Sequence, residues 1–417
     1  MSNVEANNNM NKSEANNQKV EKDIEQGKSG GSASLGLPWS RVIVMVFAAA
    51  VLVAACAVAW VLFSWQISLI VLAVLVICYT LAYFFNWIWI AVQTAPRDLK
   101  ALYCYFKILR LSSKFTKKNW SMPDIFHEVV KKHPKKACFL FEDETWSFQQ
   151  VEEFSLRVSA VLQSRGVKRG DTVALMASNY PEMPAIWLGV TRIGAVAPLI
   201  NTNQTGNTLL HSINIAKCDY VIYGNEFESA IQDIRKEIKE SIKLLKFTRR
   251  PLNTSNDTVQ VVNSEHDFTH LLETTQPAPW FLSEGEGFTG KLLYIYTSGT
   301  TGLPKAAVIS ASRMVFMASG VHYLGGLSTK DVIYCPMPLY HSAGGVITMG
   351  NAFIFGCTVA LKLKFSASSY FPDCIKYNAT AAHYIGEMCR YVLATKPSST
   401  DRRHKVRTVY GNGMRPT

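Results

Sequence analysis

The sequence predicts an α/β fold that follows an N-terminal transmembrane segment. Helix and strand signals alternate from Met122 onward, and Val42 to Val92 contains no charged residue. In addition, an apolar run at Leu292–Tyr296 enters a loop rich in Gly, Ser and Thr. Alternation of helices and strands is typical of domains built on a largely parallel sheet. At 417 residues the chain is long enough for two or three domains.

Charge and cysteine usage narrow the class of protein. The net charge of +12 indicates an anionic partner, which is a membrane surface, a phosphorylated ligand or nucleic acid. Basic residues gather directly after the apolar segment, where nucleic acid does not fit, so we predict no nucleic-acid partner. The nine cysteines include no CxxC pair and no zinc-type spacing. We therefore interpret them as reduced cytosolic or membrane-buried thiols.

The N-terminal part of the chain divides into a tail and an apolar segment. Residues 1–40 are rich in Asn, Ser, Gly, Glu and Lys and are predicted to be disordered. Residues 41–92 are predicted to insert into a membrane. One span needs about 20 apolar residues, so this run is long enough for two. A single tilted span followed by an interfacial helix that carries Trp87 and Trp89 is the alternative.

Residues 93–121 are predicted to form a basic juxtamembrane linker. From Arg97 to Lys136 the chain has eleven basic residues against Asp98, Asp124 and Glu128. Positive flanks stay on the cytosolic side, so the rest of the chain is expected to face the cytosol. The same charges suit anionic lipid, at about 1 kcal/mol for each basic residue near the surface. A merely solvated linker is the alternative interpretation.

Elements of the α/β part follow one another from residue 122. Ser147 and Gln150 form a capping-box pattern before a helix at Phe148–Leu162, which Gly166 ends. A second helix is predicted at Pro181–Ile193. Strands are predicted at Thr172–Met176, Ala195–Ile200 and Tyr220–Tyr223. Residues 251–267 are predicted to be a surface excursion.

The most informative stretch is the loop after the strand Leu292–Tyr296. Its glycines let backbone N–H groups approach an anion, its hydroxyls add donors and its lysine adds a mobile charge. Only two residues separate Gly299 from Gly302, and Ala306 follows Lys305, so this is not a Walker loop. The pattern predicts a polyphosphate cradle, and an ordinary turn is the alternative. The loop residues are Thr297, Ser298, Gly299, Thr300, Thr301, Gly302, Leu303, Pro304 and Lys305.

Two later motifs are candidates for the same site. Tyr340 and His341 precede Ser-Ala-Gly-Gly at an expected strand-to-helix turn, where a helix N-terminus favours an anion. A packed tyrosine and a hydrogen-bonded histidine are the alternative. The strand Val406–Tyr410 is followed by Gly411, Asn412 and Gly413, which alone would be a plain turn. Glu387 and Arg390 on a predicted helix are interpreted as a surface ion pair.

Taken in order, these motifs resemble those of a known family. YIYTSGTTGLPKAA, PLYHSAGG, KFSAS, YIGEMCRY and GNGMRP occur between Tyr294 and Pro416. This set is similar to the acyl-adenylate-forming superfamily, and within it to the fatty acid transport proteins, which are also very-long-chain acyl-CoA synthetases. The resemblance covers most of Met122 to Pro416. It implies that residues 122–417 form a partial AMP-binding adenylation domain with mostly parallel, helix-sandwiched sheets.

The resemblance also implies substrates and site residues. The substrates would be a long-chain fatty acid, ATP with Mg²⁺, and coenzyme A, and the location would be the endoplasmic reticulum or plasma membrane. A homo-oligomer is left open. Lys305 and His341 are assigned catalytic roles, and Thr301 is assigned to the metal. The assigned cofactor-binding residues are Tyr296, Thr297, Ser298, Gly299, Thr300, Thr301, Gly302, Lys305, Tyr340, Gly411, Asn412 and Gly413.

The chain departs from the family pattern in two places. Ala311 stands where the family usually has a histidine before the Ser-Arg pair. The superfamily's aromatic-Gly-Ala-Thr-Glu segment, ribose-binding aspartate, hinge and small C-terminal domain with its catalytic lysine do not occur before Thr417. From the resemblance we expect a long-chain or very-long-chain fatty acid–CoA ligase coupled to fatty acid uptake. The absence of these segments supports the alternative, which is a truncated, catalytically incomplete, membrane-anchored isoform that binds nucleotide or lipid and modulates a full-length partner.

Overall fold

The structure is a computed structural model that describes residues 65–252, 266–284, 286–297 and 302–414, with isolated positions between 47 and 58. The predicted disordered tail, most of the surface excursion and the loop residues Ser298–Thr301 lie outside the described residues. The chain divides into two compact units, Met1–Pro96 and Arg97–Thr417. We describe each unit by itself.

Helix α3, Trp65–Lys118, begins in the first unit and ends in the second. The predicted boundary between membrane segment and basic linker therefore falls inside one helix, because no strong breaker except Pro96 interrupts the helix-favouring sequence. Among the described residues no single helix has the length and apolar character to cross a membrane alone. The bent pair Leu69–Phe85 and Trp87–Lys118, which meet at 57°, passes that test together.

The first sheet of the second unit has the order β12-β11-β9-β10-β1-β2. All of its neighbouring strands are parallel except the hairpin partners β1 and β2. Strands from opposite ends of the unit meet here, since Phe139 of β1 lies opposite Val359 of β10. Its strands are β1 (Ala137–Phe141), β2 (Glu144–Ser147), β9 (Val332–Cys335), β10 (Thr358–Leu361), β11 (Ala381–Ile385) and β12 (Thr408–Asn412).

The second sheet has the order β6-β5-β3-β4-β7-β8, and only the hairpin pair β7 and β8 is antiparallel among the strands described. Its central strands are buried along their whole length, as expected for a parallel sheet covered on both faces. Its strands are β3 (Val173–Met176), β4 (Ala197–Leu199), β5 (Tyr220–Gly224), β6 (Lys243–Phe247), β7 (Lys291–Thr297) and β8 (Lys305–Ser310).

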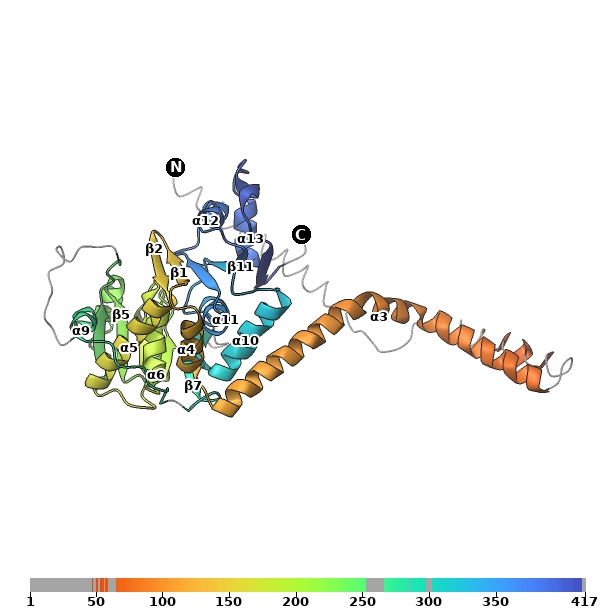
Figure 1. The fold of residues 1–417 in the computed structure, drawn as a ribbon, viewed down its shortest axis with the longest axis horizontal. Coiled ribbons are helices and arrows are strands. Elements are labelled where there is room, and N and C mark those ends of the chain that lie inside the picture. The colour runs from red at the N-terminus through yellow and green to blue at the C-terminus, as the bar shows by residue number, and fades with distance from the viewer. Residues whose placement is uncertain are drawn as a thin grey trace, which may run out of the picture. The chain divides into compact units, whose positions relative to one another are not determined.

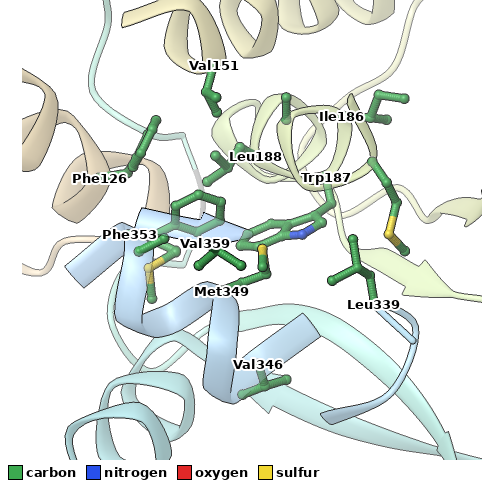
Figure 2. Close-up of a cluster of buried hydrophobic side chains, with 14 of the residues drawn as sticks. Phe126, Val151, Ile186, Trp187, Leu188, Leu339, Val346, Met349, Phe353 and Val359 are labelled. Atoms are coloured by element: carbon green, nitrogen blue, oxygen red, sulfur yellow. The ribbon is translucent and has the colours of Figure 1, made fainter. Parts of the chain in front are cut away.

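A layer of helices connects the two sheets. Helix α6 packs on β3 and β4 of the second sheet and on α4 and α5, while α5 and α11 contact strands of the first sheet (Figure 1). Figure 2 shows Trp187 of α6 beside Phe353 of α11, whose ring centroid lies 4.8 Å from that of Phe126. This aromatic group joins the layer into one core. The helices are α4 (Met122–Lys132), α5 (Phe148–Ser164), α6 (Glu182–Arg192), α10 (Ala311–Leu324) and α11 (Met349–Phe355).

A second apolar cluster covers the other face of the second sheet. Its buried residues include Leu209 and Ile213 of α7, Ile231 of α8 and Val221 of β5. The remaining helical elements are α7 (Gly206–Ile215), η1 (Asn225–Phe227), α8 (Glu228–Asp233), α9 (Phe268–Thr274), η2 (Ser342–Thr348), α12 (Tyr370–Lys376), α13 (Gly386–Leu393) and η3 (Asp401–Arg403).

The expected elements of the α/β part are present, with small shifts at their ends. The capping box is confirmed, since Gln150 N donates to Ser147 Oγ and Ser147 N donates to Gln150 Oε1. Gly166 follows the helix with φ +83°, a left-handed conformation that favours glycine. The helix predicted at Pro181–Ile193 is α6, for which these two residues are the caps. The eight described cysteines are all free, as predicted.

Candidate functional site

The carboxyl ends of parallel strands from both sheets open into one cavity of about 730 Å³. Asn203 follows β4, Glu226 follows β5, Pro338 follows β9 and Lys364 follows β10, and all four line this cavity. Ligands of open α/β sheets bind outside the carboxyl ends of the strands. The cavity is therefore the candidate ligand site of the second unit.

Asn179 ties the two sheets together at the wall of this cavity. It follows β3 of the second sheet and is buried. Its Nδ2 donates to Met337 O at 3.0 Å and to Lys362 O at 3.1 Å, while Leu339 N donates to its Oδ1 at 2.9 Å. These partners follow β9 and β10 of the first sheet. One amide side chain thus fixes the spacing of the two sheets at the candidate site.

Tyr180, the next residue, also lines the cavity and rests on a buried charge cluster. The Arg249 guanidinium lies 4.9 Å from the Tyr180 ring and pairs with the carboxylates of Glu144 and Glu182. Burial raises the pKa of Glu182 to about 7, against the opposing effect of Arg249. Glu182 Oε1 is buried and has no hydrogen-bond partner among the described residues.

The predicted phosphate loop connects β7 and β8. Thr297 ends β7 and Lys305 begins β8, and the two are directly opposite each other in the antiparallel pair. Gly302 has φ +83°, which suits the tight return of this hairpin. Since β7 runs parallel to β4, the loop leaves the sheet at the edge where Asn203 lines the cavity.

Tyr296 belongs to β7 and precedes the loop. Its hydroxyl donates to Ser212 O at 2.8 Å, so the phenol is engaged by α7. Burial raises the pKa of Tyr296.

Tyr340 and His341 lie at a strand-to-helix turn, as predicted. Tyr340 lines the cavity and accepts a hydrogen bond at 3.3 Å from Asn203 Nδ2. His341 is the N-cap of η2, and its Nδ1 accepts from Ala343 N at 3.3 Å. Element η2 is a π-helix, a rare form that often marks functional sites.

The glycine pair of this motif has a packing role. A Cβ at Gly344 would lie 2.5 Å from Pro338 O, and a Cβ at Gly345 would lie 2.0 Å from Leu339 O. Only glycine lets the π-helix approach the segment that lines the cavity this closely. The pair therefore fixes the position of η2 relative to the segment Pro338–Leu339.

The buried hydroxyl of Thr348, the last residue of η2, connects η2 with β11 and β12. Thr348 Oγ1 donates to Ala343 O and also lies 3.0 Å from His383 Nδ1 of β11 and 3.1 Å from Tyr410 Oη of β12. Burial, followed by the nearby His341, lowers the pKa of His383 to about 4. Because the Thr348 hydroxyl donates its proton to Ala343 O, its oxygen accepts hydrogen bonds from the Tyr410 hydroxyl and from Nδ1 of a neutral His383.

The predicted second glycine loop begins later than expected. Gly411 and Asn412 are the last residues of β12, because both continue the parallel pairing with Tyr384 and Ile385. Only Gly413, with φ +75°, leaves the strand. A Cβ at Gly411 would lie 2.0 Å from Tyr384 O, so glycine is required here by the neighbouring strand. Ile385 lines the cavity, which places the end of β12 next to it.

The motif YIGEMCRY, Tyr384 to Tyr391, was interpreted as part of a helix that carries a surface ion pair, and the structure confirms this in part. Tyr384 and Ile385 belong to β11, and α13 begins only at Gly386. Glu387 and Arg390 form an exposed ion pair, as expected of a surface pair of small energetic value.

Several cavity residues were not predicted from the sequence. Asn179, Thr202, Asn203 and Glu226 were missed, although each follows a strand of the second sheet. A polar residue at the carboxyl end of a predicted parallel strand was the available signal. Thr301, the predicted metal ligand, lies outside the described residues. The described residues include no group of three or more His, Cys, Asp or Glu side chains that could hold a metal ion.

The fold and site together define an α/β protein with a ligand cavity at the carboxyl ends of two largely parallel sheets. An anthranilate CoA ligase in complex with anthranoyl-AMP has the same fold, with a TM-score of 0.62 at 19% identity, over 70% of this chain and 55% of that one. A Mycobacterium tuberculosis fatty acyl CoA synthetase gives 0.59 at 18% identity, over 70% and 55%. A model of the AMP-binding enzyme family matches residues 126–417. The chain belongs to the AMP-binding enzyme family.

Its relatives by sequence are fatty acid transport proteins. Long-chain fatty acid transport protein 1 of Homo sapiens is 36% identical over 329 residues, which cover 78% of this chain and 50% of the relative. Long-chain fatty acid transport protein 2 of Rattus norvegicus is 37% identical, over 70% and 46%. A very long-chain fatty acid transport protein of Cochliobolus heterostrophus is 32% identical, over 70% and 43%. The chain spans about half the length of these relatives.

Proposed function

We propose that this chain carries the nucleotide- and acyl-binding part of a long-chain or very-long-chain fatty acid–CoA ligase. The fatty carboxylate attacks the α-phosphate of ATP, which gives acyl-AMP and pyrophosphate. The thiol of coenzyme A then attacks the acyl carbon, which gives the thioester, AMP and a proton. The observation that carries this proposal is the cavity at the carboxyl ends of both sheets, with the β7–β8 loop leaving from the same edge.

The residues have separate roles in this proposal. Hydroxyls and N–H groups between Thr297 and Gly302 hold the phosphates, and Lys305 stabilises the negative charge that develops on them. His341 and Tyr340 orient the carboxylate from the rim of η2. The end of β12, Gly411–Gly413, borders the acyl and adenine groups. Magnesium, with Thr301 as a ligand, would neutralise phosphate charge when bound.

Membrane attachment is part of the same proposal. Residues 41–92 would insert into the endoplasmic reticulum or plasma membrane, after the tail 1–40, and residues 122–417 would face the cytosol as an adenylation domain. Thioester formation on that side would retain the fatty acid as a charged product and so drive its uptake. The described part of α3 between Ile67 and Val92 exposes its large apolar side chains, which supports insertion.

Fatty-acid-dependent ATP–pyrophosphate exchange tests the enzymatic proposal. We expect exchange by a form extended to the full length of the relatives, and a loss of about 100-fold on Lys305→Ala, the usual effect of removing one electrostatic stabiliser. Lys330→Ala, which changes another exposed lysine of the same unit, is the matched control. Unchanged exchange on Lys305→Ala would remove the phosphate role of that residue.

The same assay separates the alternative function. Exchange by the extended form alone would make the 417-residue chain an inactive or regulatory protein that binds nucleotide or lipid. Exchange by both forms would show that the cradle and the cavity are sufficient for adenylation. Exchange by neither form would contradict the ligase proposal.

A further inference from the structure

The part of α3 that belongs to the second unit, Arg97–Lys118, has two apolar faces. One face packs against the domain through Cys104, Ile108 and Phe115, each only 5% exposed. Lys107 Nζ also lies 4.2 Å from the centroid of the Tyr323 ring on α10. This half of α3 is therefore a fixed part of the domain surface.

The opposite face of the same helix is apolar and exposed. Leu99 is 65% exposed and Phe106 is 59% exposed. The large side chains of this face recur at the three- and four-residue spacing of one helical stripe, so they form a continuous strip that points away from the domain. The strip consists of Leu99, Leu102, Tyr103, Phe106 and Leu109.

Basic residues border this strip on one side, since Lys100, Lys107 and Lys114 recur at a seven-residue spacing along one flank of the helix. The segment Arg97–Lys118 has seven basic residues, and Asp98 is its only acidic residue. Asp98 is paired with Arg97 at 2.9 Å. The basic residues are Arg97, Lys100, Lys107, Arg110, Lys114, Lys117 and Lys118.

We propose that this strip and its basic border form a docking surface for an anionic lipid bilayer, with Arg97–Lys118 lying in the membrane interface. A helix with Leu, Phe and Tyr on one face and Lys and Arg beside it is typical of interfacial membrane helices. Protein–protein interfaces are depleted of lysine, which argues against a protein on this surface. The inference deepens the membrane attachment proposed above, and it does not depend on catalysis.

The docking surface has a consequence for the candidate site. Because this half of α3 packs on α10, which directly follows β8, docking fixes the orientation of the β7–β8 hairpin relative to the bilayer. An attachment through residues 41–92 alone would leave that orientation undetermined.

Site-specific photocrosslinking tests the proposal in the full chain. Photoreactive benzoylphenylalanine replaces Phe106 in one variant and Leu393 of α13 in another, since Leu393 is also exposed, at 81%, but lies on a different element. The chain is reconstituted in phosphatidylcholine vesicles with or without phosphatidylserine. Adducts are resolved by mass into lipid adducts and protein dimers.

We expect lipid adducts at position 106 that exceed those at position 393 and that increase with phosphatidylserine. Arg110→Gln and Lys114→Gln should lower the ratio of docked to undocked helix by about fivefold for each charge removed. Equal amounts of lipid adduct at positions 106 and 393 in vesicle-bound chain would contradict the proposed docking surface but not the proposed insertion of residues 41–92. A dimer adduct at 106 would assign the surface to a second copy, and failure of the chain to bind vesicles would overturn both proposals.

Discussion

Replacement of Asn179 by alanine should loosen the contact between the two sheets. Asn179→Ala removes three hydrogen bonds and leaves the N–H of Leu339 and the carbonyls of Met337 and Lys362 without this partner. Each buried hydrogen bond contributes about 1 kcal/mol net, so the free energy of unfolding should fall by about 3 kcal/mol. For a unit of this size, that corresponds to a melting temperature lower by roughly 5 °C.

Thermal unfolding of the full chain in detergent, followed by tryptophan fluorescence, measures this effect. Asn214→Ala is the matched control, because Asn214 is exposed on α7. The control should melt within about 1 °C of the unmodified chain, since surface substitutions usually have small effects. If Asn179→Ala melts together with Asn214→Ala, Asn179 does not hold the sheets together and our reasoning about the cavity wall is wrong.

Substitutions at four other positions have predicted effects on the melting temperature. Gly345→Ala should lower the melting temperature by several degrees, because the new Cβ would lie 2.0 Å from Leu339 O. Gly320→Ala should stabilise α10 by about 0.5–1 kcal/mol, because no atom lies within 4 Å of the new Cβ. A higher melting temperature for Gly345→Ala than for Gly320→Ala would contradict both predictions. Burial raises the pKa of Glu182 to about 7, against an ordinary 4.5, so the contribution of this carboxyl group to stability is fully present below pH 4.5 and is lost as the pH rises through 7. Glu182→Gln should therefore remove this part of the pH dependence of the melting temperature, and an unchanged slope between pH 4.5 and 7 would refute this. Thr348→Val should cost about 2 kcal/mol more than Thr348→Ser, which keeps the hydroxyl, and equal melting of the two would argue against the buried hydroxyl contacts.

Local sequence patterns predicted much of the fold because they depend on neighbouring residues. Ser147 and Gln150 predicted a helix start, and Gly166 predicted its end, since caps involve residues three or four positions apart. Strand β7 was also predicted, as was the turn that places Tyr340 and His341, whereas the antiparallel pairing of β7 with β8 was not.

Long-range contacts could not be predicted in the same way. Asn179 bonds to partners more than 150 positions away, and nothing in its local sequence distinguishes it from an ordinary loop asparagine. The end of β12 was predicted as a loop because Gly411 has a low strand propensity, but the pairing with Tyr384 overrides that preference. The π-helical form of η2 also depends on its neighbours, through the close approach of Gly345 to Leu339.

The order of the strands in the chain has a consequence for synthesis. All strands of the second sheet come from one continuous stretch, residues 173–310, whereas the first sheet combines β1 and β2 with strands that begin at Val332. During translation the second sheet can therefore form on the ribosome while β1 still lacks its parallel neighbour β10. Closing that distant pair is slow, because a long loop must be ordered first. We expect the hairpin β1–β2 to be the part of the nascent chain that chaperones bind longest.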